Sequence, residues 1–272
     1  MNFVLFLTRI SKIIFLAGIL IFGFVSCDKN PFCINGEGDL VTRTLSLSTF
    51  SSIDLANSAT VIITQGSTQE VIVTGQQNII DKLKKTITGT HWVIDFEDNA
   101  CYNYDELTIL ITIPTLDAAD LSGSGKITIN TFTNQNDFST NISGSGDLTM
   151  TSFSHQGNLD VGISGSGSIE LGPLVGTQDV IIGVSGSGNI RANSDITDVN
   201  SAKIKISGSG SVKCFPILAD AAIVDISGSG TCEIFAANSL NVSISGSGNV
   251  YYKGIPTVVQ SISGSGSAIN SN

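Results

Sequence analysis

Charge is scarce in this sequence, since only 13% of its 272 residues are Asp, Glu, Lys or Arg. The charged residues are also unbalanced, with 13 basic against 23 acidic ones and a formal net charge of −10. Nucleic acids and anionic lipid surfaces repel an acidic protein, so the composition argues against both as partners for the body of the molecule.

Groups that commonly perform catalysis are equally sparse. The two histidines, His91 and His155, lie in unrelated segments without an acidic partner or a second ligand at metal-binding spacing. The chain contains neither Gly-x-Gly-x-x-Gly nor a Walker sequence, and no Gly-x-Ser-x-Gly of a hydrolase nucleophile elbow. The sequence therefore predicts no metal, no cofactor and no catalytic residues.

The first 26 residues have the layout of a secretory signal. Arg9 and Lys12 supply positive charge, an apolar run of 13 residues follows from position 13 to position 25, and Ser26 is small. This run is shorter than the roughly 20 residues that span a bilayer as a helix. We expect residues 1 to 26 to be removed, with an uncleaved N-terminal anchor as the alternative.

Cys27 follows this segment directly and stands where bacterial lipoproteins carry their lipidated cysteine. The stretch Phe24-Val25-Ser26-Cys27 resembles a lipobox. Cleavage before Cys27 would leave an acylated N-terminus, which anchors a protein to a membrane without spanning it. Residues 27 to 42 then form the lipidated cysteine and a short polar tether, and the mature net charge is 11 − 23 = −12.

One phrase, Ser-Gly-Ser-Gly, occurs eight times in the rest of the chain. The copies begin at residues 122, 143, 164, 185, 207, 227, 245 and 263, which spaces them by 18 to 22 residues. A nearly constant period indicates a unit that cannot bury its apolar face alone and stacks on its neighbours.

The residues around each phrase alternate between apolar and polar, as expected for strands with one buried face. Three columns are apolar in nearly every copy: Leu121, Ile142, Ile163, Val184, Ile206, Ile226, Ile244 and Ile262; then Ile127, Leu148, Ile169, Ile190, Val212, Cys232, Val250 and Ala268; then Ile129, Met150, Leu171, Ala192, Cys214, Ile234, Tyr252 and Asn270. Each unit therefore reads as a strand, a corner, a second strand and a return with a third short strand.

Stacked coils of this size predict an all-β fold, a right-handed parallel β-helix with about 18 to 22 residues per coil. A β-sandwich or a propeller is the competing architecture, but a propeller blade needs about 40 residues, twice this period. The glycines of the phrase are interpreted as structural corners, where a Cβ would clash with the next coil. These corner glycines are Gly123, Gly125, Gly144, Gly146, Gly165, Gly167, Gly186, Gly188, Gly208, Gly210, Gly228, Gly230, Gly246, Gly248, Gly264 and Gly266.

Residues 43 to 121 form an irregular entry region ahead of the repeats at 122 to 272, and together they make one domain, 43 to 272. Short alternating runs predict strands joined by tight turns. Residues 78 to 86 fit one or two turns of amphipathic helix that place Ile79, Ile80 and Leu83 on one face. Further strands are expected at residues 91 to 96 and 107 to 113.

The loop between these two strands, residues 97 to 106, admits two interpretations. Its four carboxylates, Glu97, Asp98, Asp105 and Glu106, could bind calcium, but their spacing matches no EF-hand loop and a solvated acidic loop is favoured. The nearby aromatic residues Trp92, Tyr102 and Tyr104 could stack on a sugar, although capping a core is the commoner role.

The four cysteines after Cys27 fall into two pairs. Cys214 and Cys232 occupy inward columns on adjacent coils but differ by two residues in register, which separates their Cα atoms by about 8 Å. That exceeds the disulfide limit of about 7 Å, so both are expected to be buried free thiols. Cys33 and Cys101 lie in irregular segments, where an oxidising compartment would allow a disulfide. The sequence alone leaves open whether they are bonded.

The entry segment and the repeats together resemble a known family. Phe50-Ser51-Ser52-Ile53-Asp54-Leu55, Val61-Ile62-Ile63-Thr64-Gln65-Gly66 and Asn78-Ile79-Ile80 precede the recurring aliphatic-Ser-Gly-Ser-Gly in the same order as in the head GIN domain of auto-transporter adhesins. The resemblance covers residues 43 to 272. It implies a β-helical, surface-associated protein of the Gram-negative envelope, with no catalytic residues to carry over. The chain lacks the translocator barrel of a true auto-transporter.

These observations predict a non-catalytic lipoprotein of the cell envelope, lipid-anchored in the outer membrane and facing the periplasm or the outside. It would act in adhesion, on a glycan or a protein, or as a structural spacer. The alternative is a carbohydrate-active enzyme on the same scaffold, which would need a paired acid and base. The outward columns mix Lys, Asp, Glu, Arg, Ser and Tyr without concentrating carboxylates, which favours the non-enzymatic hypothesis.

Overall fold

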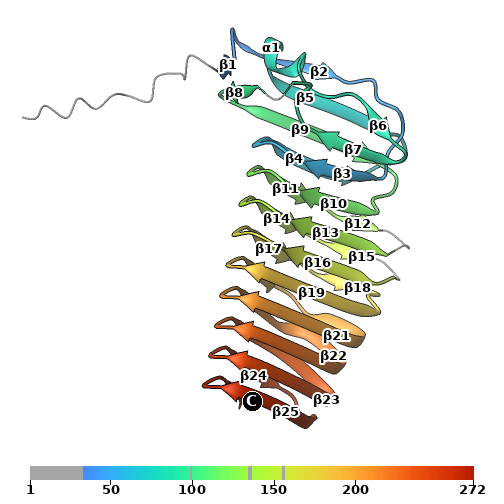
Figure 1. Ribbon diagram of the computed structural model, residues 1–272. Helices are drawn as coiled ribbons and strands as arrows, with labels where there is room; N and C mark the ends of the chain where they lie inside the picture. Colours follow the sequence, from blue (N-terminus) through green and yellow to red (C-terminus); the bar gives the residue numbers. More distant parts are fainter. Residues whose placement is uncertain (1–32, 99, 134–136, 155–156) are drawn as a thin grey trace, which may run out of the picture.

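A computed structural model describes residues 33–98, 100–133, 137–154 and 157–272. Cys27, the proposed signal segment and His155 lie outside the described residues. The chain forms a parallel β-solenoid of about seven turns, with its coils stacked from the entry region to the C-terminus (Figure 1). Within the described residues no helix is both long and apolar enough to cross a bilayer. The predicted all-β, parallel solenoid fold is confirmed.

Each coil of the repeat region has three sides. One coil consists of β13 (Phe138–Ile142), a corner, β14 (Asp147–Met150) and the short β15 (Phe153–Ser154). Each strand pairs in parallel with its counterpart one coil on, namely β16 (Leu159–Ile163), β17 (Ser168–Leu171) and β18 (Leu174–Val175). The third short strand expected in the return is therefore present.

The neighbouring coils follow the same plan. Before β13 come β10 (Ala118–Leu121), β11 (Lys126–Ile129) and β12 (Phe132–Thr133). After β18 come β19 (Asp179–Gly186), β20 (Asn189–Ala192), β21 (Ile196–Gly208), β22 (Ser211–Gly228), β23 (Thr231–Gly246), β24 (Asn249–Lys253), β25 (Thr257–Gly264) and β26 (Ser267–Asn270). In the later coils, β21 joins two sides into one long bent strand, and β22 and β23 each join all three.

The core is a set of continuous aliphatic ladders. The column before the corner is at most 3% exposed from Leu121 to Ile244, and the column from Ile127 to Val250 is at most 1% exposed. On the third side of the first repeat coils, Phe153 lies 5.7 Å from Phe132 between ring centroids, and 4.7 Å from Phe138 of β13. Parallel in-register pairing repeats each inward residue on every coil, so the ladders follow directly from the sequence columns.

The corners stack so closely that their glycine positions leave no room for a side chain. A Cβ on Gly144 would lie 1.9 Å from the carbonyl oxygen of Gly123 on the preceding coil. The second glycine of each phrase packs on the aliphatic ladder, and a Cβ on Gly146 would lie 2.5 Å from Leu121 Cδ2. From Gly186 onward the first glycine also adopts positive φ, as in Gly208 at 123°. In the corners before Gly186, where φ is not positive, the close approach of the neighbouring coil is therefore what excludes residues other than glycine.

The entry region contributes two further layers, stacked out of sequence order. The strands β3 (Ser52–Leu55) and β4 (Thr60–Gln65) pair with β10 and β11 on one side. On the other side they pair with β7 (His91–Ile94) and β9 (Leu107–Ile113), which come later in the chain. The layer of β3 and β4 therefore lies between the layer of β7 and β9 and the layer of β10 and β11. The chain crosses over the β3 and β4 layer before the repeats begin, and short-range sequence patterns do not reveal this crossover.

The N-terminal end of the solenoid is closed by antiparallel pairing. The strand β5 (Glu70–Gln76) pairs antiparallel with β9, and β2 (Leu40–Thr44) pairs antiparallel with β5. The short β6 (Ile87–Thr88) pairs antiparallel with β7. The helix α1 (Gln77–Ile80) is shorter than predicted, but Ile79, Ile80 and Leu83 do share a buried face.

Two details of the entry region differ from the sequence-based expectation. The segment from 97 to 106 contains the short strand β8 (Cys101–Asn103), which pairs in parallel with β1 (Cys33–Asn35). Trp92 does not join the two tyrosines, because it is fully buried beside Phe50, with ring centroids 5.4 Å apart. Tyr102 instead stacks on Phe96 at 3.8 Å.

The cysteines lie in two different settings. Cys33 and Cys101 are register partners on β1 and β8 and form a disulfide. Cys214 and Cys232 are free and fully buried, and Cys232 pairs in register with Val212 rather than with Cys214. The predicted two-residue offset of these two thiols is therefore confirmed.

Candidate functional site

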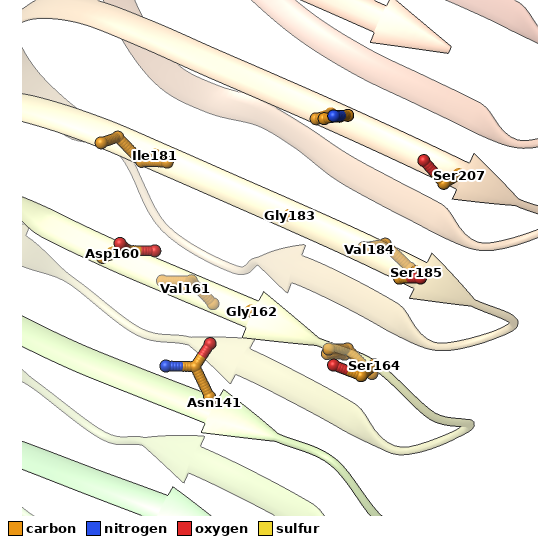
Figure 2. A pocket seen from close by; sticks show the side chains of 12 residues that line it. Asn141, Asp160, Val161, Gly162, Ser164, Ile181, Gly183, Val184, Ser185 and Ser207 are labelled. Carbon is orange, nitrogen blue, oxygen red and sulfur yellow. The ribbon is translucent and has the colours of Figure 1, made fainter. Parts of the chain in front are cut away.

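The face formed by β10, β13, β16, β19 and β21 carries a shallow hollow of about 380 Å³ (Figure 2). Its floor is made by Gly162 on β16 and Gly183 on β19, which are register partners on adjacent strands. Every other residue of this outward column has a side chain: Val93, Asp54, Asp120, Asn141, Lys205, Asp225, Ser243 and Ser261. The two glycines therefore open a gap in an otherwise continuous row of side chains.

The stacked backbone does not require glycine at these two positions. A Cβ on Gly183 would meet nothing within 4 Å, and one on Gly162 would meet only the side chain of Asn141. Neither glycine has a positive φ. Glycine inside a strand costs about 0.5 to 1 kcal/mol relative to alanine and often marks the close approach of a ligand or another backbone.

A mainly polar rim, with Ile181 as its aliphatic member, surrounds this glycine floor. In Figure 2, Asp160 and Ile181 stand on one side of the glycines along their strands, and Ser164 and Ser185 stand on the other. Asn141 and Lys205 close the row along the stacking direction. The Cα atoms of Asp160 and Lys205 are two coils and two residues apart, about 12 Å.

The two charged groups of the rim are exposed and lack protein partners. Within the described part of the chain, neither Asp160 nor Lys205 forms a side-chain hydrogen bond or an ion pair. Asp225, the register neighbour of Lys205 on the next strand, is not within ion-pair distance of it. Both groups are therefore available to a ligand in the hollow.

A second hollow of about 320 Å³ continues the first across the same face. Asp160 and Ile181 line both hollows, so the two adjoin and form one groove, whose second part extends along the strands towards their N-terminal ends. The second part adds Asp117, Asp137 and Asn158, and the Asp137 carboxylate accepts a hydrogen bond of 2.8 Å from the Asn158 backbone N–H. We call the two hollows together the front groove, and its lining consists of the residues that line either hollow. Its far end is acidic, while Lys205 supplies a positive charge at the other end.

A pair of stacked carboxylates lies on the same face, outside the front groove. Asp54 and Asp120 are register partners on β3 and β10. Burial, the largest cause, raises the pKa of Asp120; the backbone hydrogen bond from Asn141 opposes this and the charge of Asp54 adds to it. Both oxygens of Asp54 accept hydrogen bonds of 3.0 Å from Ser122, one from N–H and one from the hydroxyl. The pair thus links successive coils.

The acidic loop at 97 to 106 distributes its carboxylates among separate partners. Asp98 pairs with Lys82 at 3.1 Å, and Asp105 accepts a hydrogen bond of 2.8 Å from Gln76. Glu106 accepts one of 2.9 Å from the Thr108 hydroxyl. Among the residues that the structure describes, no three His, Cys, Asp or Glu side chains are grouped as metal ligands.

The front groove was not among the sites expected from sequence. Its signal was nevertheless visible, because Gly162 and Gly183 both stand two residues before a Ser-Gly-Ser-Gly phrase, where the other copies carry side chains. The corner glycines that the sequence did single out line the edge of the solenoid, and Cys33 and Cys101 lie at its N-terminal end. Neither group enters the groove.

Solved structures with the same fold come from Parabacteroides species. A "putative lipid binding protein" from Parabacteroides distasonis is 25% identical, with a TM-score of 0.79 over 88% of this chain and 99% of that one. A "putative adhesin" from the same species is 22% identical with a TM-score of 0.77, and one from Parabacteroides merdae is 21% identical with a TM-score of 0.78. Both adhesin matches cover 88% of this chain and 99% of the other.

No curated protein matches the chain significantly. The sequence profile of one family does, over residues 49–216 and, in a second overlapping match, over residues 154–256. These matches include β3, the Ser-Gly-Ser-Gly coils up to β24 and the front groove. The chain therefore belongs to the family described as "Putative auto-transporter adhesin, head GIN domain".

Proposed function

We propose that this protein is a non-catalytic envelope adhesin that binds a surface polysaccharide in the front groove. The observation that carries the proposal is the pair of outward glycines, Gly162 and Gly183, since neither has a positive φ and no backbone atom would obstruct a Cβ at either position. They lower the floor of the groove to the level of the backbone. A flat sugar chain could then approach the strand while its hydroxyl groups reach the polar rim.

The rim has the functional groups that a sugar chain requires. Asp160 accepts hydrogen bonds, Lys205 donates them, and Asn141 and the serine hydroxyls can do both. The groove is open and lies across several coils, which suits a chain longer than one sugar unit. Membership of an adhesin family supports a binding role for this face.

Lipid is a less suitable ligand for this scaffold, although one similar structure is described as a "putative lipid binding protein". The interior is closed to a ligand, since the inward columns are almost fully buried. In the groove, Ile181 offers an aliphatic surface that is 45% exposed, while Val161 and Val184 are buried. An acyl chain would find too little apolar surface to leave water.

The proposal places the protein at the outer membrane through a lipid on Cys27. The supporting observations are the signal-like segment before this cysteine and the position of β1, at the N-terminal end of the solenoid. Cys27→Ala should move the full chain from the membrane fraction to the soluble envelope fraction. An unchanged membrane fraction would refute lipid anchoring and leave the groove proposal standing.

The binding test is a glycan array probed with the full chain, followed by titration of the best ligand. Gly183→Val should reduce affinity by at least tenfold, because a β-branched side chain fills the floor from a Cβ position that has no protein atom within 4 Å. Asp160→Asn should cost about tenfold or more through loss of a charged hydrogen bond. Ser243→Val is the matched control, in the same outward column but outside the groove, and should bind normally.

Two results would overturn polysaccharide binding. One is the absence of any glycan ligand. This result would overturn the proposal whether or not the protein binds vesicles of phosphatidylethanolamine and phosphatidylglycerol. The other is glycan binding that Gly183→Val and Ser243→Val affect equally, since the groove would then have no part in it. Thermal unfolding of each variant shows whether the fold has been preserved.

A second candidate function, glycoside hydrolysis, is favoured by one observation. Asp54 and Asp120 are adjacent carboxyl groups, and the raised pKa of Asp120 resembles that of a general acid. Their hydrogen bonds to Ser122 and Asn141 point instead to a structural role. Hydrolysis of an array-identified glycan that is lost in Asp120→Asn would establish the enzyme.

A further inference from the structure

The C-terminal end of the solenoid is an open sheet edge. The strand β25 pairs only with β23, and β26 pairs only with β24 among the described residues. No further described strand covers the other edges of β25 and β26. Each edge therefore presents unpaired backbone N–H and C=O groups, which is a template for another strand. The N-terminal end differs, because β5 and β2 continue the sheet there.

The last coil also exposes residues of the inward columns. Val258, Gln260 and Ile262 are the register partners of Leu240, Val242 and Ile244, which are at most 2% exposed. Ile262, by contrast, is 38% exposed, since no described strand pairs with the other edge of β25. Val259 at 62% and Ile255 at 92% add aliphatic surface beside the edge.

This end lacks the charges that usually protect a sheet edge. Neither β25 nor β26 contains a charged residue, and after Glu233 the sequence has a single one, Lys253. The whole chain carries a net charge of −10. Two copies that meet at their C-terminal ends therefore bring together regions almost without charge, so the electrostatic repulsion between two acidic molecules is smallest there.

We propose that this end binds a second copy of the chain, with β25 of one protomer antiparallel to β25 of its partner about a twofold axis at Gln260. The strand is self-complementary about this point. Val258 would lie opposite Ile262 of the partner subunit, and the inward face of the sheet would continue across the junction. An isologous contact of this kind uses one patch twice and closes as a dimer.

Gln260 supports the position of the axis. Its column is apolar in the neighbouring coils, with Ile204, Val224 and Val242 all buried. An amide group would be costly there without a partner, since it has both donors and acceptors to satisfy. On the twofold axis the two amides face each other and can exchange hydrogen bonds. A foreign strand would offer this match only by chance.

The contact would lie far from the proposed membrane anchor, because the two ends of the solenoid are opposite each other (Figure 1). It would therefore join molecules tip to tip. That orientation rests on the proposed anchoring at Cys27, whereas the pairing of β25 does not depend on the anchor or on the front groove.

Cysteine cross-linking of the full chain in isolated membranes tests the axis directly. In Gln260→Cys the two cysteines would face each other with Cα atoms about 5 Å apart, within disulfide range. In Thr257→Cys the equivalent atoms would be about 20 Å apart, six residues along the strand. Mild oxidation should thus yield a covalent dimer for Gln260→Cys alone. Thr257→Cys should form one only when mixed with a Ser263→Cys copy.

Failure of Gln260→Cys to cross-link, or equal yields from Gln260→Cys and Thr257→Cys alone, would overturn the proposal. A second measurement is sedimentation of the detergent-solubilised chain, in which Ile262→Lys should raise the dimer dissociation constant at least tenfold. A dimer that Ile262→Lys leaves unchanged, or a wild-type chain that stays monomeric at every concentration, also contradicts it. Resistance of Cys214 and Cys232 to alkylation verifies that the variants are folded.

Discussion

Gly144 stacks on Gly123 so closely that a Cβ at position 144 would lie 1.9 Å from the Gly123 carbonyl oxygen. The obstacle is backbone, so it cannot rotate away as a side-chain tip could. Gly144→Ala should therefore force the two coils apart and lower the free energy of unfolding by about 3 kcal/mol. Urea-induced unfolding followed by circular dichroism measures this loss.

Gly183→Ala is the matched control for this corner substitution. A Cβ at position 183 meets no atom within 4 Å, and the backbone there is ordinary strand. Removing the flexibility of glycine from the unfolded chain should stabilise the protein by about 0.5 kcal/mol. Equal effects of the two substitutions would show that close corner stacking does not determine the need for glycine.

Cys214 and Cys232 should behave as inert hydrophobic groups in the folded protein. Burial raises the pKa of the Cys214 thiol to about 12, and it raises that of Cys232 well above its ordinary value. The reactive thiolate is therefore nearly absent at pH 8. We expect no alkylation of either by iodoacetamide in the native state and complete alkylation in guanidinium.

An introduced thiol at an exposed corner gives the reference rate for that experiment. Ser265 is exposed at the last corner, so Ser265→Cys should react within minutes under native conditions. Native labelling of Cys214 or Cys232 at a comparable rate would mean that the coils around them open frequently.

Asp120→Asn should change how stability depends on pH. Because burial raises the pKa of Asp120 above its ordinary value of 3.8, the folded chain binds this proton more tightly than the unfolded chain. This group's contribution to stability therefore falls as pH rises from about 4 through the folded-state pKa. The variant should be more stable than wild type at pH 7, by about 0.5 kcal/mol or one to two degrees in Tm.

The difference between variant and wild type is the informative quantity in that experiment. It should shrink when the pH is lowered below 4, where Asp120 is protonated in both states. Asp225→Asn, in the same outward column, controls for loss of an acidic side chain on this face. Destabilisation by Asp120→Asn at pH 7 would show that its charge is needed for the hydrogen bond to Asn141 N–H.

Removal of the disulfide should loosen the N-terminal end more than the repeats. Cys33 and Cys101 are separated by 68 residues, for which chain entropy predicts a stabilisation of about 4 kcal/mol. The paired substitution Cys33→Ala with Cys101→Ala should speed amide exchange in β1 and β8 first, because among the described strands these two pair only with each other. Exchange in β16, in the middle of the stack, should be the least affected, and faster exchange there would contradict this expectation.

Sequence columns were sufficient to predict the repeat region because its contacts are periodic. Residues such as Ile142 and Ile163 occupy the same place in successive copies, and in-register stacking buries one upon the other. The offset between Cys214 and Cys232 could be derived in the same way. Each of these contacts depends only on a strand and its neighbour one period away.

The entry region could not be predicted to the same depth because its contacts are not periodic. Nothing local in Ser52–Leu55 indicates that it lies between β7 and β10, with β7 following it in the chain. Trp92 was grouped with Tyr102 and Tyr104 by proximity in sequence, yet it is buried against Phe50 from a distant segment. Nor could turn signals reveal the pairing of β8 with β1.

The sequence by itself determined the solenoid, the inward ladders and the need for glycine at the corners, since these follow from the alternation and period of the chain. Only the tertiary structure decided what lies on the surface of the solenoid. Stacking placed Gly162 beside Gly183 and set Asp160 and Lys205 around them, and it left one edge of β25 without a partner among the described strands. The physical reason is that outward residues at equivalent positions form a continuous surface only when the coils stack in register. Likewise, a terminal strand has an unpaired edge only when no further strand pairs with it.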